Sequence, residues 1–374
     1  MGRISSFGHN LYEGRVSFDF VGRRRLWYVM SLVIVVAAVG GLLVRGFNMG
    51  IEFKGGVEFT AKIAPNDANV TKMTDAVKGA GVPAAGDPIV TTSGSDSIRI
   101  TTKPLDQSQA SQIESALRDA GAKEVSQNLI GPTWGQQVAN KAFLGLAVFL
   151  AVVVVFIWAY FREWKMSVAA LVALAHDLII TIGVYAWSGF EVTPATVTGL
   201  LTILGYSLYD TVVVFDKVRE NTRAFTKTST RTYAESANLA VNQTLVRSIN
   251  TSITALLPVG AILVVGTVVL GTGPLKDLAL ALFVGMAAGT YSSIFIATPL
   301  ASQLKESEPA VKAHAKRVLA RRSKEQSEAQ HDPADATAGV AAGHAGAHPV
   351  ARSGSAKRAQ PQRSTRSRRG RGRR

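Results

Sequence analysis

The 374-residue sequence contains no cysteine and comparatively little charge, and both features narrow what the chain can be. Without cysteine, the chain cannot be a disulfide-stapled exported scaffold, and thiolate catalysis and cysteine-ligated metal sites are excluded. Only 18% of the residues are charged, whereas 47% are hydrophobic, and the mean hydropathy is positive. This composition is unusual for a soluble globular protein and directs attention to long apolar segments.

Six apolar runs in the sequence are each long enough to cross a bilayer. The hydrocarbon core is about 30 Å thick, and a helix needs about 20 residues to span it. The runs lie at residues 26–44, 142–161, 166–187, 193–214, 241–270 and 278–300. The first is followed by Arg45, Gly46 and Phe47 rather than by a small-residue cleavage site, so we interpret it as a retained anchor. We therefore predict an α-helical polytopic membrane protein with six transmembrane helices.

Basic residues fall mainly on one side of these spans, and short flanks rich in Lys and Arg stay in the cytoplasm. One basic flank precedes span one, a second lies between spans two and three, and a third lies between spans four and five. Their basic residues are Arg15, Arg23, Arg24, Arg25, Arg162, Lys165, Lys217, Arg219, Arg223, Lys227 and Arg231. Both termini are therefore predicted to be cytoplasmic, with residues 1–25 as the N-terminal segment and residues 305–374 as a tail. Residues 26–46 form the first transmembrane helix, and residues 142–304 hold the other five.

The segment between the first two spans, residues 47–141, contains many more charged residues than the spans do. It is predicted to fold outside the cytoplasm as a small α+β domain. Strands are expected at residues 57–63, 88–92, 97–102 and 124–130, and helices at 70–80 and 108–120. The order strand, helix, strand, strand, helix, strand is that of a ferredoxin-like domain. The segment contains no histidine and no cluster that indicates catalysis, so we expect a binding or mechanical role.

Ionisable residues inside the predicted spans are the main candidates for function, because each costs about 2.5–3.5 kcal/mol near a helix centre. Asp210 in the fourth span and Arg247 in the fifth lie at about the same depth from the cytoplasmic side, roughly 10 Å. The two helices follow one another in the chain, so an Asp210–Arg247 pair is plausible. The alternative is a partly hydrated Asp210 near its helix end and an Arg247 that reaches the interface as an anchor.

Two further features lie in the third and sixth spans. His176 and Asp177 lie near the midplane, and because neighbours on a helix point about 100° apart, at most one of them can face a given partner squarely. They either make a structural hydrogen bond to a neighbouring helix or take part in proton transfer. Gly285 and Gly289 form a GxxxG motif that allows another helix, of this chain or of a partner, to approach closely.

Several motifs in this sequence resemble the SecF branch of the SecD/SecF family, whose members assist the bacterial Sec export channel. The resemblance rests on GIEFKGG at residues 50–56, Gly131-Pro132, and Ala175-His176-Asp177. The most specific match is GYSLYDTVVVFDKVREN at residues 205–221, together with QTLVRS at 243–248. Two positions depart from the family pattern: Glu52 stands where Asp is usual, and Tyr209 stands where Asn commonly precedes the acid, which removes an amide that could have bonded Asp210.

The resemblance implies a fold, a function and partners. The six helices would form half of a resistance-nodulation-division-type bundle, and a SecD-like subunit would supply the other half. The pair would use the proton gradient, with no cofactor, to help the SecY, SecE and SecG type channel export unfolded polypeptides across the plasma (inner) membrane of a bacterium. By position in the motif, Asp210 would be the proton-responsive acid and Arg247 the essential arginine. The chain would not be an enzyme.

Two other functions are compatible with parts of the sequence. A small-molecule exporter of the same superfamily would share the helices, but such exporters usually carry both six-span halves and larger outer domains in one chain. A membrane scaffold with a nucleic-acid-binding tail would explain the tail, where ten basic residues and no acid lie between residues 352 and 374, and would leave Asp210 unexplained. We expect residues 305–374 to be disordered and interpret them as a solvated cytoplasmic tail that reinforces the topology. Their basic end would attract anionic lipids and nucleic acid equally, and the sequence does not choose between them.

Overall fold

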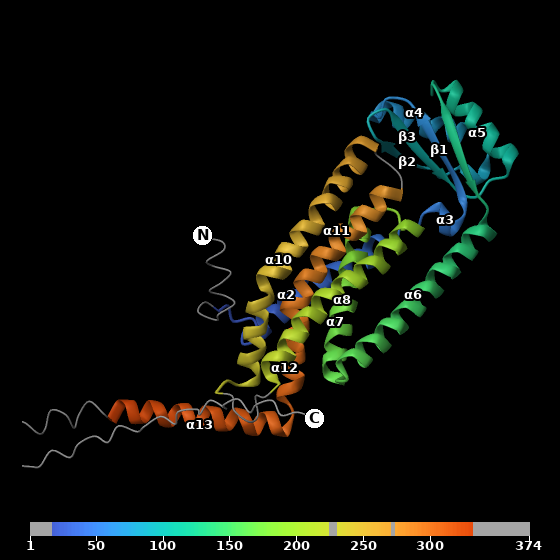
Figure 1. Ribbon diagram of the computed structural model, residues 1–374. Helices are drawn as coiled ribbons and strands as arrows, with labels where there is room; N and C mark the ends of the chain where they lie inside the picture. Colours follow the sequence, from blue (N-terminus) through green and yellow to red (C-terminus); the bar gives the residue numbers. More distant parts are fainter. Residues whose placement is uncertain (1–16, 224–229, 271–273, 332–374) are drawn as a thin grey trace, which may run out of the picture. The chain divides into compact units, whose positions relative to one another are not determined.

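The structure, a computed structural model, describes residues 17–223, 230–270 and 274–331. Within these ranges, six helices are long and apolar enough to cross a membrane (Figure 1). They are α2 (Arg24–Arg45), α6 (Pro132–Phe161), α7 (Trp164–Ser188), α8 (Pro194–Thr222), α10 (Tyr233–Val265) continued by the π-helix η2 (Gly266–Leu270), and α11 (Pro274–Ser292) continued by the π-helix η3 (Ser293–Ala297) and α12 (Thr298–Glu306). Each predicted span coincides with one of them, so the chain is a multi-pass membrane protein.

Some of the predicted features lie outside the described residues. They are most of the N-terminal segment, including Arg15, the basic residue Lys227, and the part of the tail after residue 331, which includes its basic end.

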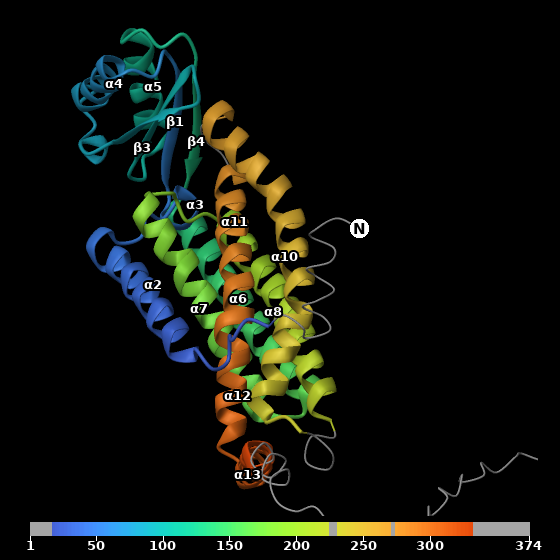
Figure 2. The same ribbon diagram turned by 90° about the vertical axis from the view of Figure 1, so that its left-hand side faces the viewer.

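The spanning helices divide into a buried inner set and an exposed outer set (Figure 2). In α7, α8 and the α11–α12 helix, 50–61% of the most apolar 18-residue window is buried, against 11–17% in α2, α6 and α10. Small residues allow the inner helices to approach one another. A Cβ atom at Gly285 would meet the side chain of Ile203 on α8, and one at Gly289 would lie 2.7 Å from Cβ of Ser207. The structure thus places the GxxxG motif against α8 of the same chain.

Residues 56–130 form a four-stranded antiparallel sheet with two helices (Figure 2). Its elements are β1 (Gly56–Lys62), α4 (Asp67–Gly79), the 3₁₀ helix η1 (Pro83–Ala85), β2 (Ile89–Ser93), β3 (Ser97–Thr102), α5 (Gln107–Asp119) and β4 (Val125–Ile130), and the strand order is β2-β3-β1-β4. Alternate residues of β1, Val57, Phe59 and Ala61, are fully buried in a core with residues of α4 and α5. Each strand and helix predicted in this segment lies within three residues of its observed position.

A close backbone contact joins this domain to the membrane helices. The short helix α3 (Ile51–Lys54) ends at Gly55, whose φ of 75° favours glycine. A Cβ atom at Gly55 would lie 2.7 Å from Cα of Pro132, the first residue of α6. Gly55 is therefore required because α6 begins directly against it, whereas a Cβ atom at Gly56 would lie 2.6 Å from the carbonyl oxygen of Thr102 on β3.

The expected disorder of residues 305–374 is wrong for the first part of the tail. α12 continues to Glu306, and α13 (Pro309–His331) follows it. Lys305 pairs with Glu163 of the α6–α7 turn, and Lys165 of the same turn lies 3.0 Å from Glu308. These ion pairs fix the start of the tail on the α6–α7 hairpin, and the many Ala, Lys, Arg and Glu residues that follow are good helix formers.

Candidate functional site: two buried carboxylates among serines

Asp210 lies on the inner face of α8, is 8% exposed, and is held by hydroxyl groups alone. Ser248 of α10 donates a hydrogen bond to Oδ1 at 2.6 Å, and Ser293 of η3 donates to Oδ2 at 2.5 Å. Within the described ranges, Asp210 forms no ion pair. A carboxylate with neutral donors and no cation can accept a proton without breaking a salt bridge.

Arg247 does not pair with Asp210, so the pairing that their equal depth suggested is not formed. Its side chain is exposed on α10, and its Nη2 donates to the hydroxyl of Tyr209 at 2.8 Å. The reason is helical geometry: Arg247 and Ser248 point about 100° apart, and Ser248 is the one that faces Asp210. Tyr209, which replaces the usual asparagine, thus bonds the arginine, and serines supply the donors for Asp210.

Asp177 and His176 occupy a second polar site, on α7. Asp177 is 1% exposed, and its Oδ2 accepts hydrogen bonds from Ser207 of α8 at 2.5 Å and from Ser292 of α11 at 2.9 Å. Nδ1 of His176 lies 3.4 Å from Oδ1 of Asp177, and the imidazole stacks on the ring of Tyr291. Nε2 of His176 is buried and has no hydrogen-bond partner among the described residues. Asp177 therefore bonds side chains of α8 and α11, and His176 contacts α11 through the ring of Tyr291.

Two consecutive serines at the start of the π-helix η3 reach two different acids, because neighbouring residues on a helix point in different directions. Ser292 is the last residue of α11 and Ser293 the first of η3, and their hydroxyls bond Asp177 on α7 and Asp210 on α8. Such wide turns often mark functional positions in helices. None of these hydrogen bonds was predicted from the sequence, because a serine in an apolar helix is common and gives no signal by itself. The four serines concerned are Ser207, Ser248, Ser292 and Ser293. Buried hydroxyls spaced around two intramembrane acids are the signal that could have identified them.

Outside the membrane spans, carboxylates meet a cation instead. Arg99 of β3, on the sheet face opposite α4 and α5, binds Glu191 of the α7–α8 loop through Nη2 at 2.9 Å and Nη1 at 3.2 Å. Nη1 also reaches Glu58 of β1 at 3.3 Å. Burial raises the pKa of Glu58 above its ordinary value, and the charge of Arg99 opposes that shift. We call these three residues the Arg99 cluster; nothing in the sequence indicated it.

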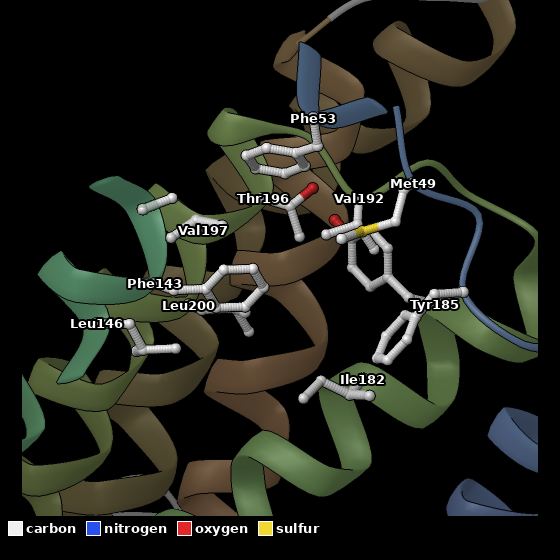
Figure 3. Close-up of a pocket in the computed structure, with 12 residues that line it drawn as sticks. Met49, Phe53, Phe143, Leu146, Ile182, Tyr185, Val192, Thr196, Val197 and Leu200 are labelled. Carbon is white, nitrogen blue, oxygen red and sulfur yellow. The ribbon is translucent and has the colours of Figure 1, made fainter. Parts of the chain in front are cut away.

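Backbone hydrogen bonds and an apolar cavity accompany the Arg99 cluster. The α7–α8 loop pairs with the segment before α3, through Val192 N to Asn48 O at 2.7 Å and Gly50 N to Val192 O at 3.0 Å. A nearby cavity of about 210 Å³ lies among Phe53, Phe143 of α6, Ile182 of α7 and Leu200 of α8 (Figure 3). Tyr185 and Thr196 also line this cavity, but most of its lining side chains are apolar. The ionisable groups that could act lie deeper, at Asp210 and Asp177.

Metal ligands do not explain these acids: the described residues contain no group of three or more histidine or acidic side chains placed to hold a metal ion.

Comparison with known proteins identifies the family. Residues 112–307 match the model of the protein export membrane protein SecD/SecF, C-terminal region, and residues 40–66 match the SecD/SecF GG motif. The chain is 51% identical over 326 residues to the protein translocase subunit SecF of Streptomyces coelicolor, with 86% of each chain covered. The chain belongs to the SecD/SecF family. Membership assigns it an accessory role in the Sec protein translocase.

The SecDF protein of Thermus thermophilus extends the comparison in sequence and in structure. The SecDF subunit of Thermus thermophilus is 32% identical over 302 residues, which cover 79% of this chain and 40% of that protein. A crystal structure of the Thermus SecDF superposes with a TM-score of 0.68 and 33% identity over 78% of this chain and 39% of that one. This chain thus corresponds to about two fifths of a SecDF protein, which joins a SecD part and a SecF part in one polypeptide.

Proposed function

We propose that this chain uses the proton gradient, together with a SecD-like subunit, to promote export of unfolded polypeptides through a SecY, SecE and SecG type channel. The observation that carries the proposal is Asp210, a buried carboxylate in a spanning helix whose only hydrogen-bond donors in the described structure are the hydroxyls of Ser248 and Ser293. A proton on Asp210 would remove one full charge from the contact between α8, α10 and η3. Such a change is a workable trigger for helix rearrangement.

The outer faces of α8 and α10 support a partner in the membrane. Exposed polar residues follow one face of each helix: Thr198, Thr202 and Tyr209 on α8, and Arg247, Asn250, Thr251 and Thr254 on α10. An arginine that faces lipid within a span is costly, at about 2.5–3.5 kcal/mol near the centre. We therefore place the SecD-like subunit against this face, where Arg247 would lie at the boundary between the two subunits. The SecD–SecF fusion in Thermus is consistent with such a pairing.

The remaining parts of the proposal concern class and location. The strand order β2-β3-β1-β4 supports a ferredoxin-like domain, and the six spans support half of a resistance-nodulation-division-type bundle. Basic residues flanking the α6–α7 turn and following α8 favour cytoplasmic termini and an outer domain, in the inner membrane of a bacterium. The chain would act by conformational change, without a cofactor and without catalysing a covalent reaction.

The test is Asp210→Asn in membranes that contain the complex with its SecD-like partner. The variant should remain folded and partner-bound, and it should lose gradient-stimulated export because its amide cannot take up a proton. Asp216→Asn is the matched control, since Asp216 is exposed further along the same helix and should tolerate the change. Normal stimulation of export by the gradient in Asp210→Asn would refute the proposal.

A further inference from the structure

We propose that Asp177 is a second proton-binding acid of this chain and that Ser292 and Ser293 link its protonation to that of Asp210. The proposal rests on the proposed proton-coupled function and extends it to a site on another helix. Its basis is the near identity of the two environments. Both acids are buried, both accept two serine hydroxyls, and, among the residues that the structure describes, neither is paired with a lysine or arginine.

Each site can accommodate a charged and a neutral acid without moving the backbone. The Ser292 hydroxyl lies within reach of Asp177 Oδ2 at 2.9 Å and of the Gly289 carbonyl at 3.2 Å. The Ser293 hydroxyl likewise reaches Asp210 Oδ2 at 2.5 Å and the Thr290 carbonyl at 3.2 Å. A hydroxyl has one hydrogen and two acceptor lone pairs, so each serine can donate to only one of these oxygens at a time.

The proton step follows from this choice of acceptors. When the acid is ionised, the serine donates its hydrogen to the carboxylate. When a proton arrives, an O–H bond forms on the carboxyl group, which then donates to the serine oxygen, and the serine hydrogen turns to the backbone carbonyl. No other bond forms or breaks, and no buried donor loses its partner, so protonation avoids the cost of an unsatisfied polar group.

The adjacency of the two serines supplies the link between the acids. Ser292 and Ser293 lie at the junction of α11 and the π-helix η3, so a shift of this turn at one acid moves the hydroxyl that bonds the other. Titratable groups on the surrounding elements are His176 beside Asp177 on α7, Tyr291 on α11, and Asp210 on α8. His176 has a buried Nε2 without a partner, which gives Asp177 a neighbouring base that Asp210 lacks.

Infrared difference spectroscopy of the purified complex, recorded as the pH is changed, tests the proposal directly. A carboxyl group that gains a proton produces a C=O band, so Asp177→Asn should remove part of the pH-dependent signal of the wild type, as should Asp210→Asn. Asp177→Asn should also reduce gradient-stimulated export at least tenfold in complexes of normal yield. A carboxyl spectrum unchanged by Asp177→Asn would overturn the inference.

Ser292→Ala provides a second variant in case Asp177→Asn does not fold. It removes one donor to Asp177 and should shift the pH dependence of export, whereas Ser302→Ala should not. Ser302 is a matched control because it is 1% exposed and its hydroxyl has no hydrogen-bond partner in the described structure. An identical pH profile for Ser292→Ala and wild type would contradict the link. If Asp210→Asn abolishes stimulation and Asp177→Asn does not, only the inference fails; if Asp210→Asn exports normally, the proposed function fails.

Discussion

The carboxylates of the spanning helices and those of the Arg99 cluster are both buried, but they have different hydrogen-bond donors. In the membrane, Asp210 and Asp177 receive only neutral hydrogen-bond donors, apart from the histidine beside Asp177. At the outer domain, Glu191 and Glu58 receive the guanidinium of Arg99. A carboxylate beside a guanidinium is bound to a fixed cation, although at Glu58 the charge of Arg99 only opposes the effect of burial, whereas a carboxylate among hydroxyls has no such cation. The first arrangement suits a fixed attachment and the second suits a group that changes charge.

The Arg99 cluster lies where the α+β domain contacts the start of α8, so its role is to attach the domain rather than to change charge. Glu191 lies two residues before Thr193, which caps the start of α8, and α8 carries Asp210 in its second half. The Arg99 cluster and the backbone pairing of Val192 thus attach the α+β domain to the helix that holds Asp210. A movement of α8 would be passed to the domain through this loop.

The largest expected effect comes from removing the hydroxyl donors of Asp210. Ser248→Ala and Ser293→Ala should each lower the free energy of unfolding by about 1.5–3 kcal/mol near neutral pH, because each removes a hydrogen bond to a charged group. Thermal unfolding of the purified chain measures this loss, and Ser302→Ala is the control. If Ser302→Ala lowered the free energy of unfolding as much as Ser248→Ala and Ser293→Ala do, the hydrogen bonds to Asp210 would have no special role in stability.

A smaller effect is expected from the ion pair at the outer domain. A double-mutant cycle of Arg99→Ala and Glu191→Ala should give a coupling energy of about 1–3 kcal/mol, between the ranges for exposed and buried pairs. The control is the cycle of Lys62 and Glu124, an exposed pair at 3.8 Å, whose coupling should be close to zero. Equal coupling in the two cycles would mean that the Arg99 cluster does not hold the domain.

The smallest effect concerns the pH dependence at Glu58. Because burial raises the pKa of Glu58 above that of an unfolded glutamate, the protonated form is favoured in the folded state. Its stabilising contribution is full below the unfolded pKa and is lost as the pH rises through the folded pKa. The wild type should therefore gain stability relative to Glu58→Gln as the pH falls from about 7 to about 4. A constant difference in unfolding temperature across this range would contradict the pKa shift.

Much of the architecture could be predicted from the sequence because single-residue chemistry determines it. Apolar runs of sufficient length located the six spans, and the alternation of residues 97–102 located β3 with its observed bounds. Asp210 was identified because a carboxylate in a membrane-spanning helix is energetically costly and therefore indicates a function. The family motifs gave the function class, which the comparisons support.

The partners of the buried acids depend on how each helix is rotated about its axis, which the spacing of residues in the sequence does not determine. Equal depth suggested an Asp210–Arg247 pair, but the rotation of α10 directs Ser248 to the acid and Arg247 outward. The π-helix that begins at Ser293 is a backbone irregularity with no sequence signal of its own. The Arg99–Glu191 contact joins residues 92 positions apart and needed the tertiary structure.

Proton uptake into vesicles that contain the complex of this chain with its SecD-like partner tests the central claim most directly. With an imposed gradient, a pH-sensitive dye inside the vesicles should report proton entry for the wild type and for Asp216→Asn. Entry should fall to the level of empty vesicles for Asp210→Asn. Equal rates of entry for Asp210→Asn and the wild type would contradict the account.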